Sequence, residues 1–140
     1  MKSNLEVKLF APKEYWQLTR EQLDDISNGC GGSGVGALVP DSFFGLSVKP
    51  ACDIHDFMYH VGKGDQGKID ADEVLLNNMI RICNEQFKVE KRMWLYKIRL
   101  NLCQKYYYVV DKCGGPWYWA GKNEPEEEGS VVIKNRSLIF

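Results

Sequence analysis

The chain lacks a long apolar run: none of its hydrophobic stretches reaches the length of about 20 residues that a membrane-spanning helix needs. Its first residues also lack the apolar region of a signal peptide, and no segment repeats along the chain. We therefore expect a protein that is cytoplasmic as made, has no transmembrane segment, and reaches any outside target through lysis or a specialised delivery route.

Net charge is also nearly absent, since 18 Lys and Arg residues stand against 19 Asp and Glu residues. A net charge of −1 gives no electrostatic reason to expect a nucleic-acid partner, and it gives no strong attraction to anionic lipid. Hydrophobic residues make up 44% of the 140 residues, which is ordinary for a domain that buries a core. The composition predicts one domain over residues 1–140, with an N-terminal extension at 1–11 and a tail at 114–140.

Cysteine is too sparse for a disulfide-rich scaffold, and its count is odd. Five cysteines cannot all be paired within one chain. Cys83 and Cys103 fall on apolar stripes of predicted helices, so we expect both to be buried thiols.

The spacing of the apolar residues is that of helices over most of the chain. It predicts a first helix over residues 12–27 and two further helices over residues 50–61 and 69–87. The glycine-rich residues 62–67 between the last two should turn the chain, so that these helices pack antiparallel. A long helix without glycine or proline is predicted over residues 88–112. The predicted fold class is therefore all-α.

The long predicted helix carries apolar residues on two sides, and both sides need cover. We expect one side to pack on the two preceding helices and the other to pack on the tail or on another subunit, which leaves a homo-oligomer open. A coiled-coil dimer is the rival explanation of the repeat. The first side consists of Val89, Met93, Tyr96, Leu100, Cys103, Tyr107 and Val110, and the second of Leu95, Ile98, Leu102, Tyr106 and Val109.

The tail begins with an aromatic cluster, Trp117-Tyr118-Trp119. Such residues favour a membrane interface, but they also pack well on helices, and we favour packing on the helices. An acidic linker follows at residues 122–129, and the last residues contain strand-like segments at 131–133 and 138–140.

The residues best suited to chemistry lie in the helix predicted over residues 50–61. Its apolar positions recur with the spacing i, i+3, i+4 and i+7, and they form one stripe that can face a core. His55 and Tyr59 are i, i+4 neighbours on a different face, and Asp56 points in a third direction. One rigid helix can therefore offer an imidazole to one group and a carboxylate to another.

A second acid should orient that histidine. Asp72 heads an otherwise apolar stripe on the following helix, and a buried carboxylate without a partner is costly. We expect the ring N–H of His55 to be its partner. The alternative is that Asp72 is an acid in the first helical turn, with Asp70 as the N-cap and Glu73 reaching back to it. Both arrangements can hold together, and we favour Asp72 over Asp70 as the orienting acid because the face that Asp70 shares is more polar.

The segment from residue 28 to 36 holds five glycines in nine residues, so it can turn its carbonyl oxygens toward a common point. A phosphate-binding P-loop would need Gly-Lys-Ser/Thr at its end, which is absent, and a dinucleotide-binding loop would need a preceding strand. A plain flexible turn is the simplest alternative. Ligation of a hard cation such as Ca²⁺, which accepts carbonyl and carboxylate oxygens, is the best functional use of this segment.

Taken together, these motifs resemble those of the phospholipase A2 superfamily, whose active-site helix carries the signature Cys-x-x-His-Asp-x-x-x-Tyr. The signature reads Cys52, His55, Asp56 and Tyr59 here. The run Ala-Cys-x-x-His-Asp-Phe is similar to the short bacterial and fungal branch, and Ala71-Asp72 followed by Leu75 and Met79 fits the next helix of that branch. The resemblance spans residues 28–83 and does not extend to either end of the chain.

The resemblance implies a calcium-dependent hydrolase of the sn-2 ester of phospholipids, acting at a membrane or micelle surface. His55 would be the general base toward water, Asp72 would orient it, and Tyr59 would hydrogen-bond Asp72. Asp56 would be the carboxylate ligand of Ca²⁺, with backbone carbonyls of the glycine-rich loop completing the site. The candidate carbonyl donors are Gly29, Gly31 and Ser33.

The resemblance also bears on the cysteines. Cys30 and Cys52 could form the bridge between loop and helix that the superfamily has, whereas Ala51 and Met58 stand where the secreted animal enzymes have cysteine. One optional disulfide suits a bacterial or phage protein made in a reducing cytoplasm.

Two other function classes remain open. An inactive relative could keep the fold as a binding module for lipid or protein without turnover. A transition-metal site built from Cys52, His55, Asp56 and His60 is disfavoured, because these residues do not share one helical face and no second Cys/His pair accompanies them.

Overall fold

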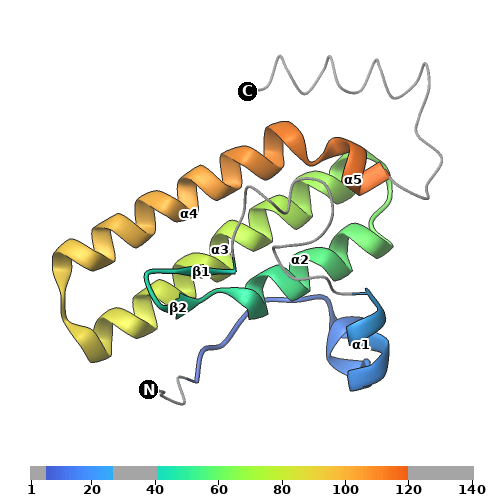
Figure 1. Cartoon of the computed structure of the whole chain (residues 1–140). Coiled ribbons are helices and arrows are strands. Elements are labelled where there is room, and N and C mark those ends of the chain that lie inside the picture. Colours follow the sequence, from blue (N-terminus) through green and yellow to red (C-terminus); the bar gives the residue numbers. More distant parts are fainter. Residues whose placement is uncertain (1–5, 27–40, 120–140) are drawn as a thin grey trace.

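The computed structural model of the chain describes residues 6–26 and 41–119, and these residues are mostly helical, which confirms the all-α fold class (Figure 1). None of the helices described is long and apolar enough to cross a membrane. The elements in chain order are the 3-10 helix η1 at Lys13–Gln17, α1 at Arg20–Ile26, β1 at Ser42–Phe43, β2 at Leu46–Ser47, α2 at Lys49–Val61, α3 at Gly64–Glu90, α4 at Met93–Cys113 and α5 at Gly115–Trp119.

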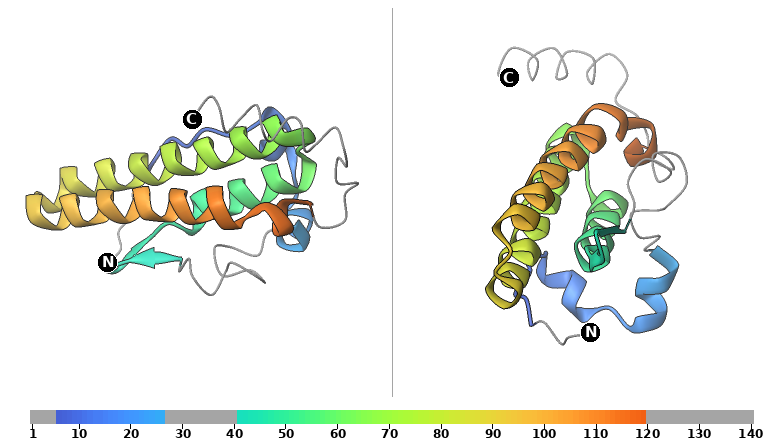
Figure 2. Two further views of the ribbon diagram at one scale, coloured as in Figure 1. Left: turned by 90° about the horizontal axis from the view of Figure 1, so that it is seen from above. Right: turned by 60° about the vertical axis from the view of Figure 1, so that its left-hand side comes forward.

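The helices α2, α3 and α4 form the body of the fold. Two residues join α2 to α3 and two join α3 to α4, and such short connections make consecutive helices antiparallel neighbours. Figure 2 shows α3 and α4 side by side along their length, with α2 packed along the first part of α3. This arrangement brings the early turns of α3 alongside α2 and the last turns of α4.

The start of α3 differs from the sequence prediction, because the helix begins at Gly64 rather than at residue 69. Residues 62–67 were expected to turn the chain, but only Gly62 and Lys63 do so. A Cβ at Gly67 would lie 2.4 Å from the hydroxyl oxygen of Tyr118. Glycine at this position therefore serves the close approach of α5 to a helix and does not mark a turn.

The first predicted helix is also two elements in the structure. Leu18 is extended (ψ 144°). The side-chain oxygen of Thr19 then accepts a hydrogen bond from the backbone N–H of Gln22 at 3.1 Å, and the side-chain oxygen of Gln22 accepts one from the backbone N–H of Thr19 at 3.0 Å. This reciprocal pair is a capping box, which starts a new helix. The predicted helix over residues 12–27 is therefore divided into η1 and α1.

Only one face of α4 is buried, and it draws on both of the predicted apolar sides. Trp94, Ile98 and Tyr108 are exposed. Cys83 of α3 and Cys103 of α4 are free and buried, with their sulfur atoms 3.6 Å apart, which confirms the prediction of buried thiols. The buried residues of α4 are Leu95, Arg99, Cys103, Tyr106 and Val110.

Arg99, a cation within this buried face, ties the strands to the helices. It is 3% exposed and donates to the backbone oxygens of Phe43 at 3.2 Å and Phe44 at 2.8 Å. It also pairs with Glu90 of α3 at 2.7 Å. Phe44 and Gly45 form the two-residue turn between β1 and β2, both with positive φ (49° and 83°), as tight hairpins require. The hairpin that leads into α2 is thus held on α4.

The segment before η1 is anchored on α3 through one side chain. Asn78 is fully buried and bonds both the backbone N–H and the carbonyl of Phe10, each at 2.8 Å. Part of the expected N-terminal extension therefore packs on the helices.

Candidate active site

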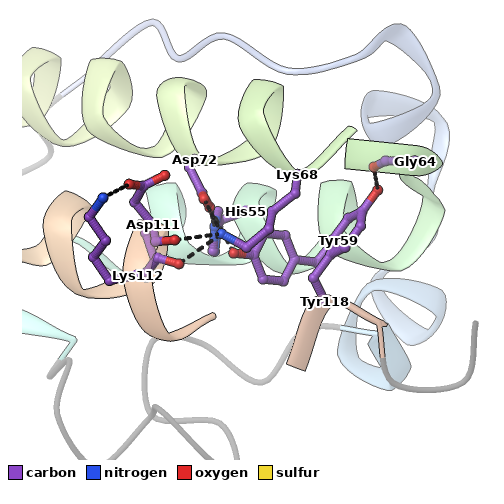
Figure 3. A network of polar contacts seen from close by, with 9 residues as sticks. His55, Tyr59, Gly64, Lys68, Asp72, Asp111, Lys112 and Tyr118 are labelled. Carbon is purple, nitrogen blue, oxygen red and sulfur yellow. Dashed lines mark hydrogen bonds and ion pairs between the residues drawn. The ribbon is translucent and has the colours of Figure 1, made fainter. Parts of the chain in front are cut away.

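The predicted pairing of His55 with Asp72 is present in the structure. His55 Nε2 lies 2.8 Å from Asp72 Oδ1, and the two residues are 2% and 1% exposed (Figure 3). The pair forms because α2 and α3 run antiparallel, so that the middle of α2 faces the early turns of α3. None of the hydrogen bonds among the described residues uses His55 Nδ1, which leaves that nitrogen to exchange a proton with a small molecule.

Tyr59 hydrogen-bonds the same carboxylate, as the resemblance implied. Its hydroxyl donates to Asp72 Oδ1 at 2.8 Å, and its ring lies 4.1 Å from the His55 ring, centroid to centroid. Burial and the negative charge of Asp72 raise the pKa of Tyr59 above its ordinary value. Tyr59 is therefore a firm hydrogen-bond donor to Asp72 at all ordinary pH.

Lys68 is a member of the site that the sequence prediction missed. Its ammonium group, 5% exposed, donates to Asp72 Oδ2 at 2.8 Å. It also donates to the carbonyl oxygens of Val110 at 2.9 Å and Asp111 at 3.2 Å, near the end of α4 (Figure 3). The i, i+4 spacing of Lys68 and Asp72 was the available signal. It carried no weight when the helix was predicted to begin at residue 69.

The electrostatics of Asp72 follow from these neighbours. Burial alone would raise the pKa of its carboxyl group. The hydrogen bond and charge of His55, followed by those of Lys68, outweigh that effect and hold the pKa of Asp72 below its ordinary value. Asp72 is therefore an ionised carboxylate at neutral pH, as the orienting partner of a histidine base must be.

The alternative prediction, that Asp70 is the N-cap of α3, is wrong. Because α3 begins at Gly64, Asp70 lies well inside the helix and cannot be its N-cap. It is exposed and accepts a hydrogen bond from Gln66 at 2.8 Å. Asp72 also lies past the first turn, so a favourable interaction with the helix dipole does not explain its position.

The aromatic cluster of the tail folds back on the helices, as expected. The Trp117 ring stands edge-on to His55 at 5.9 Å and to Tyr59 at 5.3 Å, between ring centroids. Tyr118 is buried, and its hydroxyl donates to the carbonyl of Gly64 at 2.8 Å. The helix α5 thereby packs against the site through the rings of Trp117 and Tyr118. The strand-like segments at 131–133 and 138–140 lie outside the described residues.

Of the residues expected to bind calcium, Asp56 lies within the described part of the chain. Asp56 follows His55 on α2 and is 6% exposed. The candidate donors Gly29, Gly31 and Ser33 lie outside the described residues. Within residues 6–26 and 41–119, no three His, Cys, Asp or Glu side chains gather as a metal site made of side chains would require. A single carboxylate fits Ca²⁺ only together with backbone carbonyls, and the superfamily resemblance implies that donor set.

The transition-metal alternative fails on Cys52. This cysteine is disulfide-bonded, so it has no thiolate to offer, and His60 is exposed at the end of α2. Cys30, the partner that the resemblance implies for Cys52, lies outside the described residues.

Comparison of the chain with protein-family models, with curated protein sequences and with solved structures returned no match.

Proposed function

We propose that the protein is a calcium-dependent hydrolase of phospholipid esters, of the phospholipase A2 type. The observation that carries the proposal is the buried pair of His55 and Asp72, joined at 2.8 Å with a tyrosine on the same carboxylate oxygen. A histidine braced by an ionised acid on one ring nitrogen is suited to act as a general base at the other. The resemblance of the surrounding motif supports water and a lipid ester as the reactants.

The proposed reaction begins with proton transfer to His55. In its neutral form His55 takes a proton from water at Nδ1, and the hydroxide formed attacks the carbonyl carbon of the sn-2 ester. Asp72 keeps Nε2 protonated and favours the imidazolium that results. The same proton then passes from Nδ1 to the leaving alkoxide, so that the products are a fatty acid and a lysophospholipid.

Asp56 and the carbonyls of Gly29, Gly31 and Ser33 are the residues proposed to hold Ca²⁺. Bound there, the ion would polarise the ester carbonyl and stabilise the developing oxyanion. Asp56 is adjacent to His55 in the chain, so one helix would position both the base and a ligand of the ion.

A second candidate is a binding module that keeps this fold without turnover. The burial of His55 favours it, because a ring that is 2% exposed and lies beside Trp117 is closed to a bulky lipid unless α5 or its surroundings move. Binding to phospholipid micelles without release of fatty acid would identify the module.

The test is a hydrolysis assay on mixed micelles of phosphatidylcholine and detergent, with added Ca²⁺ or with a chelator. We expect release of the sn-2 fatty acid by the wild type, no release in chelator, and a fall of about 10³-fold in rate for His55→Gln. His60→Gln is the matched control, since His60 is the exposed histidine of the same helix. Equal rates for wild type and His55→Gln would refute the proposal.

A further inference from the structure

Lys68 is a buried cation to which the proposed reaction assigns no proton transfer. We propose that Lys68 is a positioning residue, which fixes the Asp72 carboxylate behind His55 and joins it to the C-terminal end of α4. The catalytic part of this proposal rests on the proposed function, whereas the effect of Lys68 on Asp72 does not.

The contacts of Lys68 exclude a direct role toward substrate. An ammonium group has three N–H donors, and Lys68 has three acceptors, at 2.8, 2.9 and 3.2 Å. With Lys68 5% exposed, no donor remains for a lipid phosphate or an ester oxygen. The side chain therefore acts through the groups that it holds.

The division of hydrogen bonds on Asp72 shows what is held. Oδ1 takes the bonds of His55 and Tyr59 from α2, whereas Oδ2 takes the bond of Lys68, one turn earlier on α3. Anchoring Oδ2 prevents the carboxylate from rotating about its Cβ–Cγ bond and presenting the other oxygen to His55. The positive charge also offsets the cost of burying a carboxylate between two helices.

The other two acceptors link this anchor to α4 and α5. The carbonyls of Val110 and Asp111 belong to the last turns of α4, where the helix dipole is negative and attracts a cation. Three residues after Asp111, Gly114 passes so close to Tyr59 that a Cβ would lie 2.6 Å from its hydroxyl oxygen. Lys68 thus fixes the point at which α4 ends and α5 begins to cover the site.

Three substitutions separate the charge of Lys68 from its hydrogen bonds. Lys68→Arg keeps the charge, Lys68→Gln keeps a neutral donor, and Lys68→Met keeps neither. Lys88→Met is the matched control, because Lys88 is an exposed lysine of the same helix and pairs only with Glu85 among the described residues.

The first readout is the ¹³C NMR titration of the Asp72 carboxyl group in the full chain without substrate. Besides Lys68, the titratable groups of the described residues that interact with Asp72 are His55 and Tyr59 from α2 and Tyr118 from α5, and the charge of Asp111 from α4 acts on Tyr59. All of these groups are unchanged in the variants. We expect the titration midpoint of Asp72 to rise by about one pH unit in Lys68→Gln and Lys68→Met, and to stay at the wild-type value in Lys68→Arg and Lys88→Met.

The second readout is the pH profile of ester hydrolysis. We expect kcat to fall by about 10- to 100-fold in Lys68→Met with KM changed less than about twofold, and Lys68→Arg to recover most of the loss. If Lys68→Met does not fold, Lys68→Gln and Lys68→Arg decide the question by the same measurements.

The outcomes for the two proposals are distinct. An Asp72 midpoint and a kcat that stay at their wild-type values in folded Lys68→Gln would overturn the role of Lys68. A wild type that hydrolyses no ester would refute the proposed function, and the Asp72 titration would still decide whether Lys68 holds the carboxylate.

Discussion

Asp72 accepts hydrogen bonds from two residues of α2 and one of its own helix, and it does so while almost fully buried. The ion pair with Lys68 requires the carboxylate in its ionised form. A buried acid of this kind makes both the site and the stability of the fold depend on pH.

The first prediction concerns this pH dependence. Because the pKa of Asp72 in the folded protein lies below its ordinary value of 3.8, its contribution to stability is complete above that value. The contribution is lost as the pH falls through the folded pKa. We expect the free energy of unfolding, measured with urea between pH 2 and pH 7, to fall less steeply below about pH 4 in Asp72→Asn than in the wild type.

Asp70→Asn is the matched control for this measurement, since Asp70 is an exposed acid of the same helix. Its profile should follow that of the wild type. At pH 7 we expect Asp72→Asn to lose about 3 kcal/mol, because it leaves the buried Lys68 ammonium without its counter-charge. Identical slopes below about pH 4 in wild type and Asp72→Asn would contradict a lowered pKa of Asp72 in the folded protein.

Among the elements, the junction of α4 and α5 has little room for an added side chain. Gly114 separates the two helices, and a Cβ there would lie 2.5 Å from the Val110 carbonyl oxygen and 2.6 Å from the Tyr59 hydroxyl. The carbonyl belongs to the helix backbone and the hydroxyl is hydrogen-bonded to Asp72, so neither group can move easily to make room. At Gly115, the next residue, an added Cβ would lie in open space.

The second prediction compares these neighbouring glycines. We expect Gly114→Ala to lower the free energy of unfolding by about 1–3 kcal/mol through steric overlap. Gly115→Ala should be neutral or slightly stabilising, because it only reduces the freedom of the unfolded chain. Thermal melting of the two variants side by side checks this, and equal melting temperatures would contradict the close approach of α4 to Tyr59.

At the scale of the whole molecule, Arg99 joins three elements: the hairpin through two carbonyls, α3 through Glu90, and its own helix α4. No stretch of the sequence marks it for this role, because it interrupts an apolar stripe and would ordinarily be placed in solvent. The structure instead buries it and satisfies its guanidinium group.

The third prediction follows from that placement. We expect Arg99→Met to lower the free energy of unfolding by about 3 kcal/mol, since two hairpin carbonyls lose their donor. Arg92→Met, at an exposed arginine in the connection before α4, should change it by less than about 0.5 kcal/mol. Urea unfolding at neutral pH measures both, and a loss in Arg99→Met no larger than that of the control would refute this role of Arg99.

The parts of the site that could be predicted are those governed by local spacing. The i, i+4 relation of His55 and Tyr59 and the stripe headed by Asp72 follow from helix geometry alone, and the short chain between them requires an antiparallel return. Lys68 could not be predicted as part of the site, because its helix was predicted to begin at residue 69, whereas it begins at Gly64. Arg99 could not be predicted at all, because burial of a cation depends on acceptors distant in the chain.

The sequence by itself determined that the chain is mostly helical and that His55 and Tyr59 share a face of α2, because helical periodicity is a local property of the sequence. The tertiary structure alone decided where α3 begins, which face of α4 is buried, and which cation accompanies Asp72. Each of these depends on a group from another element: the Tyr118 hydroxyl against Gly67, the hairpin carbonyls at Arg99, and the end of α4 at Lys68. These contacts join residues that are far apart in the sequence, so their contribution to the free energy of folding depends on the tertiary structure and not on a local sequence pattern.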